Sequence, residues 1–216
     1  SSSGMLLAVL VTLISNQIIS YEWLAIGLVL GTLVGASAAS FVKMTSMPEL
    51  VALFNGFGGI ASLLVGSAEY LGAGSLGLIS LTAIFLTLII GGITFSGSLV
   101  AYGKLSEILP GKQITFKGQR IVLVAIFIAA LLFGAQLIFN FQMVEGWNPL
   151  FSFLLLISFA LVIGLLITLP IGGADMPVII ALLNSYSGLA ASAAGFVINN
   201  NVLIVAGALV GASGLI

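Results

Sequence analysis

Long apolar runs, broken by almost no charged residue, are the feature that most constrains how this chain folds. The run 76–101, for example, contains no Asp, Glu, Lys or Arg. Only 5% of all residues are charged and 61% are hydrophobic, whereas soluble domains are about 25% charged. The chain has too few polar residues to cover a surface that faces water, so most of its surface faces lipid. The sequence therefore predicts an all-α integral membrane protein.

The apolar runs predict a polytopic helical bundle of about eight transmembrane helices, forming one transmembrane domain over 1–216. A helix that crosses the hydrocarbon core needs about 20 apolar residues, at a rise of about 1.5 Å each. Unbroken runs of this length favour helices over a β-barrel, whose strands alternate over about ten residues. The predicted spans are 5–20, 23–42, 49–68, 76–101, 121–140, 150–170, 177–198 and 202–216.

All the basic residues fall on one side of such a bundle. When the connections are numbered in chain order, the even ones contain all five basic residues and the odd ones contain none. The positive-inside rule then places the even connections in the cytoplasm and, with eight spans, both chain ends as well. The five basic residues are Lys43, Lys104, Lys112, Lys117 and Arg120.

Several kinds of chemistry are excluded by what the sequence lacks. Without cysteine or histidine, the chain offers no disulfide, no thiolate metal site and no imidazole base. A G-x-G-x-x-G match at 72–77 lies in a short connection between spans, not between a strand and a helix, so it does not predict a nucleotide site. We therefore expect no catalytic residue, no metal and no cofactor bound by this chain, and its net charge of −1 predicts no nucleic-acid partner.

Small residues recur at every fourth position in two of the predicted spans. The second span carries Gly27, Gly31 and Gly35, and the last carries Gly207 and Gly211. A ridge of this kind lets two helix backbones approach closely. Both ridges indicate helix packing within the chain, with an interface to another subunit as the alternative.

Three polar residues are predicted to lie at a similar depth below the cytoplasmic face. Asn55 follows Glu49 by six residues and Ser98 precedes Lys104 by six, so each lies roughly 9 Å from the border along its helix. Asn184 lies roughly 10 Å into its own span. An unpaired amide in hydrocarbon costs several kcal/mol, so these groups must face protein or water. They indicate either hydrogen bonds between helices or a hydrated polar conduit.

Such a conduit would carry protons only with help from outside the chain. Hydroxyls and amides can orient water and relay a proton, but they do not titrate near neutral pH. A coupled pump usually contains a group that does, most often histidine, and the chain has none. Glu49 and Asp175 lie at the membrane border, not within a span. Either a partner subunit supplies the titrating group or the conduit is passive.

Three stretches of the sequence resemble the membrane domain of proton-translocating NAD(P) transhydrogenase, specifically its β subunit. They are MTSMPELVALFNGFGGIASLLVG at 44–66, GGITFSGSLVAYGKL at 91–105, and the run 171–214 that begins IGGADMPVIIALLNSYSG. Together they cover somewhat over a third of the chain, in matching order. The resemblance implies that inward proton flow through the membrane domain drives hydride transfer from NADH to NADP⁺ on soluble domains.

The resemblance also implies the cofactors and partners of a larger complex. NADP(H) is expected on a cytoplasmic domain that follows the last span, which is cut short at Ile216. NAD(H) is expected on a domain of the α subunit, whose transmembrane helices would pack against this chain within the lipid bilayer. The complex is expected to form a dimer. The implied location is the bacterial inner membrane, with a cytoplasmic C-terminus, in preference to the mitochondrial inner membrane.

Five residues receive roles from the resemblance. Ser98 and Asn184 match polar positions of the family's proton pathway, whereas at Asn55 the sequence departs from the family, in which a histidine usually occupies this place. We expect a histidine of the α subunit to approach this level, with Asn55 as its hydrogen-bond partner. Asp175 matches an acid that couples the pathway to the NADP(H) domain, and Glu49 is expected beside it in this coupling region.

Two other functions remain open from the residues alone. An independent secondary transporter would be expected to show internal repeats, and the chain shows no convincing one. A purely structural anchor would gather soluble domains at the membrane. Polar residues at a similar depth on three spans argue against an anchor, because holding soluble domains at the membrane requires no polar groups within the spans.

Overall fold

The computed structural model describes residues 21–139 and 148–214 of the chain. Within these two ranges every regular element is helical, which confirms the predicted all-α fold for this part of the chain. The chain divides into two compact units, 1–45 and 46–216.

The first unit contains α2 (Tyr21–Phe41), and the short 3₁₀ helix η1 (Met44–Ser46) follows it. The other elements belong to the second unit. They are α3 (Met47–Gly72), α4 (Leu78–Leu105), α5 (Gln119–Phe139), α6 (Pro149–Thr168), the 3₁₀ helix η2 (Gly173–Asp175), α7 (Met176–Val197) and α8 (Asn201–Ser213).

Six helical stretches among the described residues are long and apolar enough to cross a membrane. They match the six predicted spans from 23–42 to 177–198, with ends that differ by a few residues. The predicted span 202–216 corresponds to α8, whose 13 residues extend about 20 Å, less than the hydrocarbon core of about 30 Å. The predicted span 5–20 lies outside the described residues. The chain is thus a multi-pass membrane protein, and the count of about eight spans stays a prediction.

Helix starts follow local sequence signals. Pro48, Pro149 and Pro177 occupy the first turns of α3, α6 and α7, where the missing N–H of proline costs no helical hydrogen bond. Asn148 and Asn200 precede α6 and α8, and each side-chain oxygen accepts a hydrogen bond from an N–H of the first turn, at 2.9 Å and 3.0 Å. Such caps satisfy backbone donors that would otherwise lack a partner.

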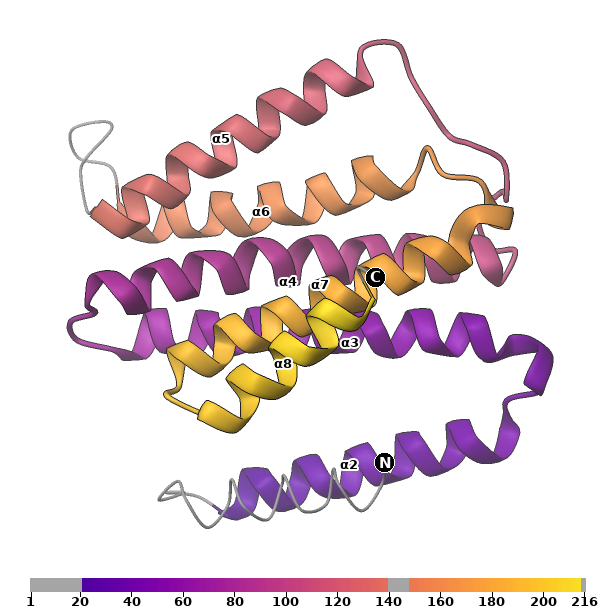
Figure 1. The fold of residues 1–216 in the computed structure, drawn as a ribbon, viewed down its shortest axis with the longest axis horizontal. Coiled ribbons are helices and arrows are strands. Elements are labelled where there is room, and N and C mark those ends of the chain that lie inside the picture. Colours follow the sequence, from indigo (N-terminus) through magenta and orange to yellow (C-terminus); the bar gives the residue numbers. More distant parts are fainter. Residues whose placement is uncertain (1–20, 140–147, 215–216) are drawn as a thin grey trace. The chain divides into compact units, whose positions relative to one another are not determined.

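Helix α4 is the central element of the second unit (Figure 1). It packs against α3, α5, α6 and α7, while α8 packs on α7. Ile84 and Leu88 of α4 are fully buried, as are Leu156 and Ile163 of α6. Because lipid tails are as apolar as these side chains, close packing, not transfer from water, favours the contact.

Glycines bring α3 and α4 into close contact. A Cβ on Gly59 would lie 2.9 Å from the carbonyl oxygen of Gly91, and a Cβ on Gly91 would lie 2.7 Å from the carbonyl oxygen of Gly59. These distances are too short for any larger residue without a shift of backbone. The backbones of α3 and α4 therefore meet closely enough for short polar side chains on the two helices to touch.

The predicted glycine ridge of the last span also packs within the chain, against α7. Gly207 and Gly211 are both buried. A Cβ on Gly207 would lie 2.6 Å from the carbonyl oxygen of Gly188, and a Cβ on Gly211 would lie 2.9 Å from Cδ2 of Leu189. Packing within the chain is confirmed for this ridge, whereas the partner of the ridge in α2 stays a prediction.

Candidate functional site

A buried hydrogen-bonded cluster joins three helices of the second unit. Asn55 of α3 donates from Nδ2 to Oγ of Ser98 on α4, at 2.9 Å. Ser187 of α7 donates from Oγ to Oδ1 of Asn55 at 2.6 Å, and the same hydroxyl lies 3.2 Å from the backbone carbonyl oxygen of Asn55. Asn55 is 8% exposed and Ser98 is fully buried. The amide of Asn55 thus bridges α4 and α7.

Glycines beside the cluster bring its members within reach. A Cβ on Gly56 would lie 3.2 Å from Cβ of Ser98, so the absence of a side chain there lets Ser98 approach α3. On the other side, Ser187 lies against Gly58, where a Cβ would come within 3.8 Å of its Oγ. The local sequence Asn-Gly-Phe-Gly-Gly around Asn55 therefore keeps space for polar contacts from both neighbouring helices.

The hydrogen bonds leave spare capacity for a proton relay. Asn55 uses its amide oxygen and its amide nitrogen on different helices, so the orientation of the amide is set from both sides. Ser98 accepts from Asn55, and within the described part of the chain its own proton has no acceptor. A serine hydroxyl can donate one hydrogen bond and accept two. Because Ser98 is fully buried within this chain, its proton can go to an internal water.

Two further buried hydroxyls near this cluster have no hydrogen-bond partner among the described residues. Oγ1 of Thr94 lies one turn from Ser98 on α4, and Oγ1 of Thr168 lies near the end of α6. Thr168 packs against α4 at Gly97, where a Cβ would lie 2.9 Å from its Oγ1. Unpaired buried hydroxyls are rare, and each calls for a specific explanation, such as an internal water.

The structure brings together two of the three residues predicted for the pathway. Asn55 and Ser98 are in direct contact, whereas Asn184 lies outside the cluster and is exposed on this chain. The α7 residue in contact is Ser187, three positions later on the same helix. Ser187 is not among the residues predicted from the sequence, because nothing in a mostly apolar helix indicates which side faces its neighbours.

The two predicted border acids lie where α3 and α7 begin. Glu49 is half-buried in the first turn of α3, and Asp175 is exposed as the last residue of η2, directly before α7. A small apolar cluster that includes Ala52, Ala101 and Met176 packs the starts of α3 and α7 against the end of α4. Both acids therefore lie at the same end of the bundle.

Two connections meet at this end. The backbone N–H of Gly173, beside Asp175, donates to the carbonyl oxygen of Gly111 at 2.7 Å. The N–H of Ile114 donates to the carbonyl oxygen of Leu169 at 3.1 Å. The α4–α5 connection thus lies against the α6–α7 connection, as expected if even connections share one side of the membrane.

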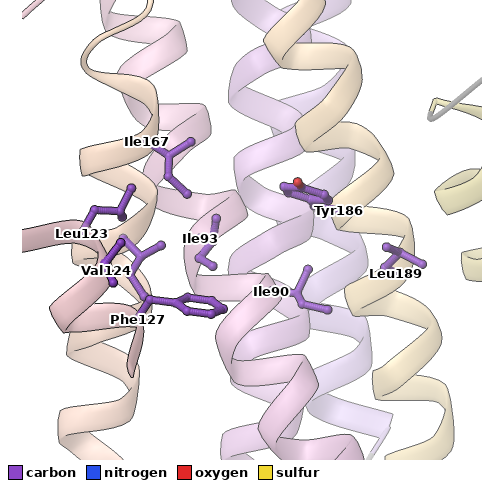
Figure 2. Close-up of a pocket in the computed structure, with 9 residues that line it drawn as sticks. Ile90, Ile93, Leu123, Val124, Phe127, Ile167, Tyr186 and Leu189 are labelled. Carbon is purple, nitrogen blue, oxygen red and sulfur yellow. The ribbon is translucent and has the colours of Figure 1, made fainter. Parts of the chain in front are cut away.

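A separate pocket between α4, α5, α6 and α7 is apolar. It has a volume of about 400 Å³, and Figure 2 shows aliphatic side chains and Phe127 around it, with Tyr186 at one side. Among its lining residues only Tyr186 carries a polar side-chain group. The pocket therefore lacks the amides and acids of a polar path, and the Asn55 cluster remains the candidate site.

The sequence is similar to known proteins along its whole length. The family model described as NAD(P) transhydrogenase beta subunit matches residues 1–216. Two relatives from Rhodospirillum rubrum, one of them from a designated strain, are both named NAD(P) transhydrogenase subunit beta, and each is 42% identical over 221 residues. The matches cover 99% of this chain and 46% of each relative, so the chain spans about half the length of these curated relatives.

Proposed function

Because this chain belongs to the NAD(P) transhydrogenase beta subunit family, we propose that its helices form the proton-translocating membrane part of a transhydrogenase. In the assembled complex, inward proton flow through these helices would drive hydride transfer from NADH to NADP⁺. The nucleotides would bind to soluble domains, NAD(H) on the α subunit and NADP(H) on a domain that follows α8. The chain itself would supply the proton route and no hydride-transfer residue.

The observation that carries this proposal is the hydrogen-bonded cluster of buried Asn55 and Ser98 with half-buried Ser187. A purely structural helix contact needs only one hydrogen bond between neighbours, but here one amide bridges three helices and a hydroxyl proton is left over. Thr94 continues the polar line one turn along α4, roughly 6 Å by helical rise, and its hydroxyl has no hydrogen-bond partner in the described part of the chain. A water between these groups would satisfy both hydroxyls and link them into a relay.

The titrating group of this relay would come from the α subunit. Asn55 cannot change its charge near neutral pH, so its part is to hold and orient a neighbour. A histidine on an α-subunit helix, approaching the level of Asn55, would complete the site with a group that titrates near pH 7.

Asn184 supports the presence of such a partner. Its amide is exposed on α7 within a membrane span. A side-chain amide facing lipid would cost several kcal/mol, because hydrocarbon offers it no hydrogen bond. We therefore place Asn184 at the contact with the α-subunit helices, where it would line the other wall of the route.

Asp175 and Glu49 would form the cytoplasmic mouth of the route. All five basic residues lie in even connections or in the helix turns next to them, and the α4–α5 and α6–α7 connections meet beside Asp175. This arrangement supports a cytoplasmic location for the mouth and for the C-terminus, in a bacterial inner membrane. The NADP(H) domain would contact Asp175, so that nucleotide state and proton access influence each other. A dimer of the complex completes the proposed assembly.

Proton flux in proteoliposomes tests this function directly. The full complex should change the internal pH only while both nucleotides turn over, as read by an entrapped pH-sensitive dye. Asn184→Leu should abolish this flux, because it replaces the proposed wall amide by an aliphatic group of similar size, and the complex should still assemble. Normal flux in the assembled Asn184→Leu complex would refute the role of Asn184. Solute movement without nucleotides would indicate a secondary transporter, and no flux in the unmodified complex would indicate an anchor.

A further inference from the structure

Lys104 is a buried basic residue that the topology argument used only as a marker of the cytoplasmic side. It lies in the last turn of α4 and is 3% exposed. Lysines at the ends of membrane helices usually extend their ammonium group into water. Lys104 does the opposite, so its charge must be satisfied by groups of the protein.

Three backbone carbonyl groups satisfy the ammonium group. Nζ of Lys104 donates to the carbonyl oxygens of Ile171 at 2.5 Å, Leu169 at 2.6 Å and Lys112 at 3.3 Å. An ammonium group has three N–H donors, so the number of acceptors matches the number of donors. The most distant partner, Ile171, lies 67 positions after Lys104 in the sequence. The three contacts join the α4–α5 and α6–α7 connections to the end of α4.

The contacts hold the connection that carries Asp175. We call the residues 169–175, between α6 and α7, the Asp175 loop. Leu169 is the C-cap of α6, so its carbonyl is among those left without a helical partner, and the partial negative charge of a helix C-terminus attracts a cation there. Lys104 therefore fastens one end of the Asp175 loop, while Gly111 accepts the N–H of Gly173 at the other end.

We propose that Lys104 is a positioning residue that ties the Asp175 loop to the helix that carries Ser98. Ser98 lies six residues before Lys104 on α4, roughly 9 Å along the helix. A displacement of the Asp175 loop must therefore either move the end of α4 or break the contacts to the ammonium group. Its consequence for turnover rests on the proposed function, because only then does the Asp175 loop respond to nucleotide state.

Hydrogen exchange on the full complex tests the contact itself. The reporters are the loop amides of Ile114 and Gly173, each of which bonds to the opposite connection. Lys104→Met removes the donors but keeps the apolar stem, and it should speed exchange in both peptides by about tenfold or more, as expected when a local structural unit loosens. Lys117→Met is the matched control, because Lys117 is exposed on the α4–α5 connection. This variant should leave the exchange rates of both peptides unchanged.

Conservative variants keep the test decisive. Lys104→Arg retains a cation and should recover most of the protection of the Asp175 loop. If the Lys104→Met complex does not assemble, Lys104→Gln is tested in its place. The neutral amide of glutamine cannot donate to all three carbonyl oxygens, so exchange at Ile114 and Gly173 should again be faster. Unchanged exchange in the assembled Met or Gln variant would overturn the proposal.

Turnover in proteoliposomes separates a positioning role from a merely structural one. Proton-driven formation of NADPH should fall at least about fivefold in Lys104→Met and recover in Lys104→Arg, while Lys117→Met stays at the level of the unmodified complex. Faster exchange with unchanged turnover would reduce Lys104 to a structural contact and overturn the coupling role. An unmodified complex that moves no protons would instead refute the proposed function, with the exchange result still valid.

Discussion

Asn55 is the residue around which the candidate site is organised. Its amide contacts Ser98 through the nitrogen and Ser187 through the oxygen, so a single side chain satisfies groups on two other helices. A carboxylate has no donor for Ser98, and an aliphatic side chain has no polar group for either serine. An imidazole, like the amide, offers a donor and an acceptor on different atoms. Either side chain could therefore satisfy both serines, which fits the expectation from the resemblance that histidine occupies this place in related membrane domains.

Thr94 gives the first prediction, because its hydroxyl is buried and has no hydrogen-bond partner within ranges 21–139 and 148–214. Thr94→Val keeps the shape and removes the hydroxyl, so any water held there should be lost. We expect proton-driven NADPH formation in proteoliposomes to fall about tenfold. Thermal stability of the complex should not fall, since no hydrogen bond within the protein is broken.

Thr87→Val is the matched control for this prediction. Thr87 is also fully buried on α4, but its hydroxyl donates to the carbonyl oxygen of Ala83 at 2.7 Å and has no need of water. This variant should keep the turnover of the unmodified complex. An equal loss of turnover in both variants, or no loss in Thr94→Val, would show that the Thr94 hydroxyl plays no part in proton movement.

At the scale of elements, α4 connects the candidate site to the end of the bundle that holds Asp175. It carries Thr94 and Ser98 in its second half and Lys104 in its last turn, and it packs against α3, α5, α6 and α7. Its contact with α3 depends on Gly59 and Gly91, whose backbones approach too closely for a Cβ. The hydrogen bond between Asn55 and Ser98 therefore depends on glycine packing one turn away.

Adjacent glycines on α3 allow a direct test of this dependence. Gly59→Ala should destabilise the helix pair by about 1–3 kcal/mol, because the added methyl group meets backbone atoms at 2.9 Å. Gly58→Ala should be close to neutral, because the nearest atom would lie 3.8 Å away. Denaturant unfolding of the purified complex measures both variants. Equal stability of the two would contradict the close-packed interface.

The positions of most helices, and the depth of residues along them, could be predicted from the sequence. Apolar run length alone located the six helices from α2 to α7, since a membrane span must satisfy its backbone internally over a set thickness. Counting residues from border charges placed Asn55 and Ser98 at one depth, and these two residues are in contact. Both inferences depend on distance along a helix axis, which sequence determines well.

Rotation about the helix axis could not be predicted. In α7 almost every face is apolar, so periodicity does not distinguish Asn184 from Ser187, which lies about 60° away on the helix. The contact made by Ser187 depends on how α7 packs on α3, a tertiary property. The burial of Lys104 was missed for a related reason, because its partners are backbone carbonyl groups that leave no pattern in the sequence.

At the scale of the whole molecule, we propose that the chain is one part of a larger assembly. It spans about half the length of its curated relatives, and the soluble domains proposed to bind nucleotide lie outside it. We propose that the exposed amide of Asn184 faces another subunit, which would complete the polar route. The Asp175 loop and Lys104 would then transmit nucleotide state to that route.

The most direct test measures proton uptake per hydride transferred in proteoliposomes that contain the full complex, with Asn55 replaced by leucine or by histidine. Asn55→Leu cannot bond to Ser98 or Ser187, and we expect proton uptake and proton-driven turnover to be lost in an assembled complex. Asn55→His can bond to both serines and adds a titratable group, so it should retain coupled turnover. Proton uptake by Asn55→Leu at the rate and ratio of the unmodified complex would contradict a proton route through the Asn55 cluster.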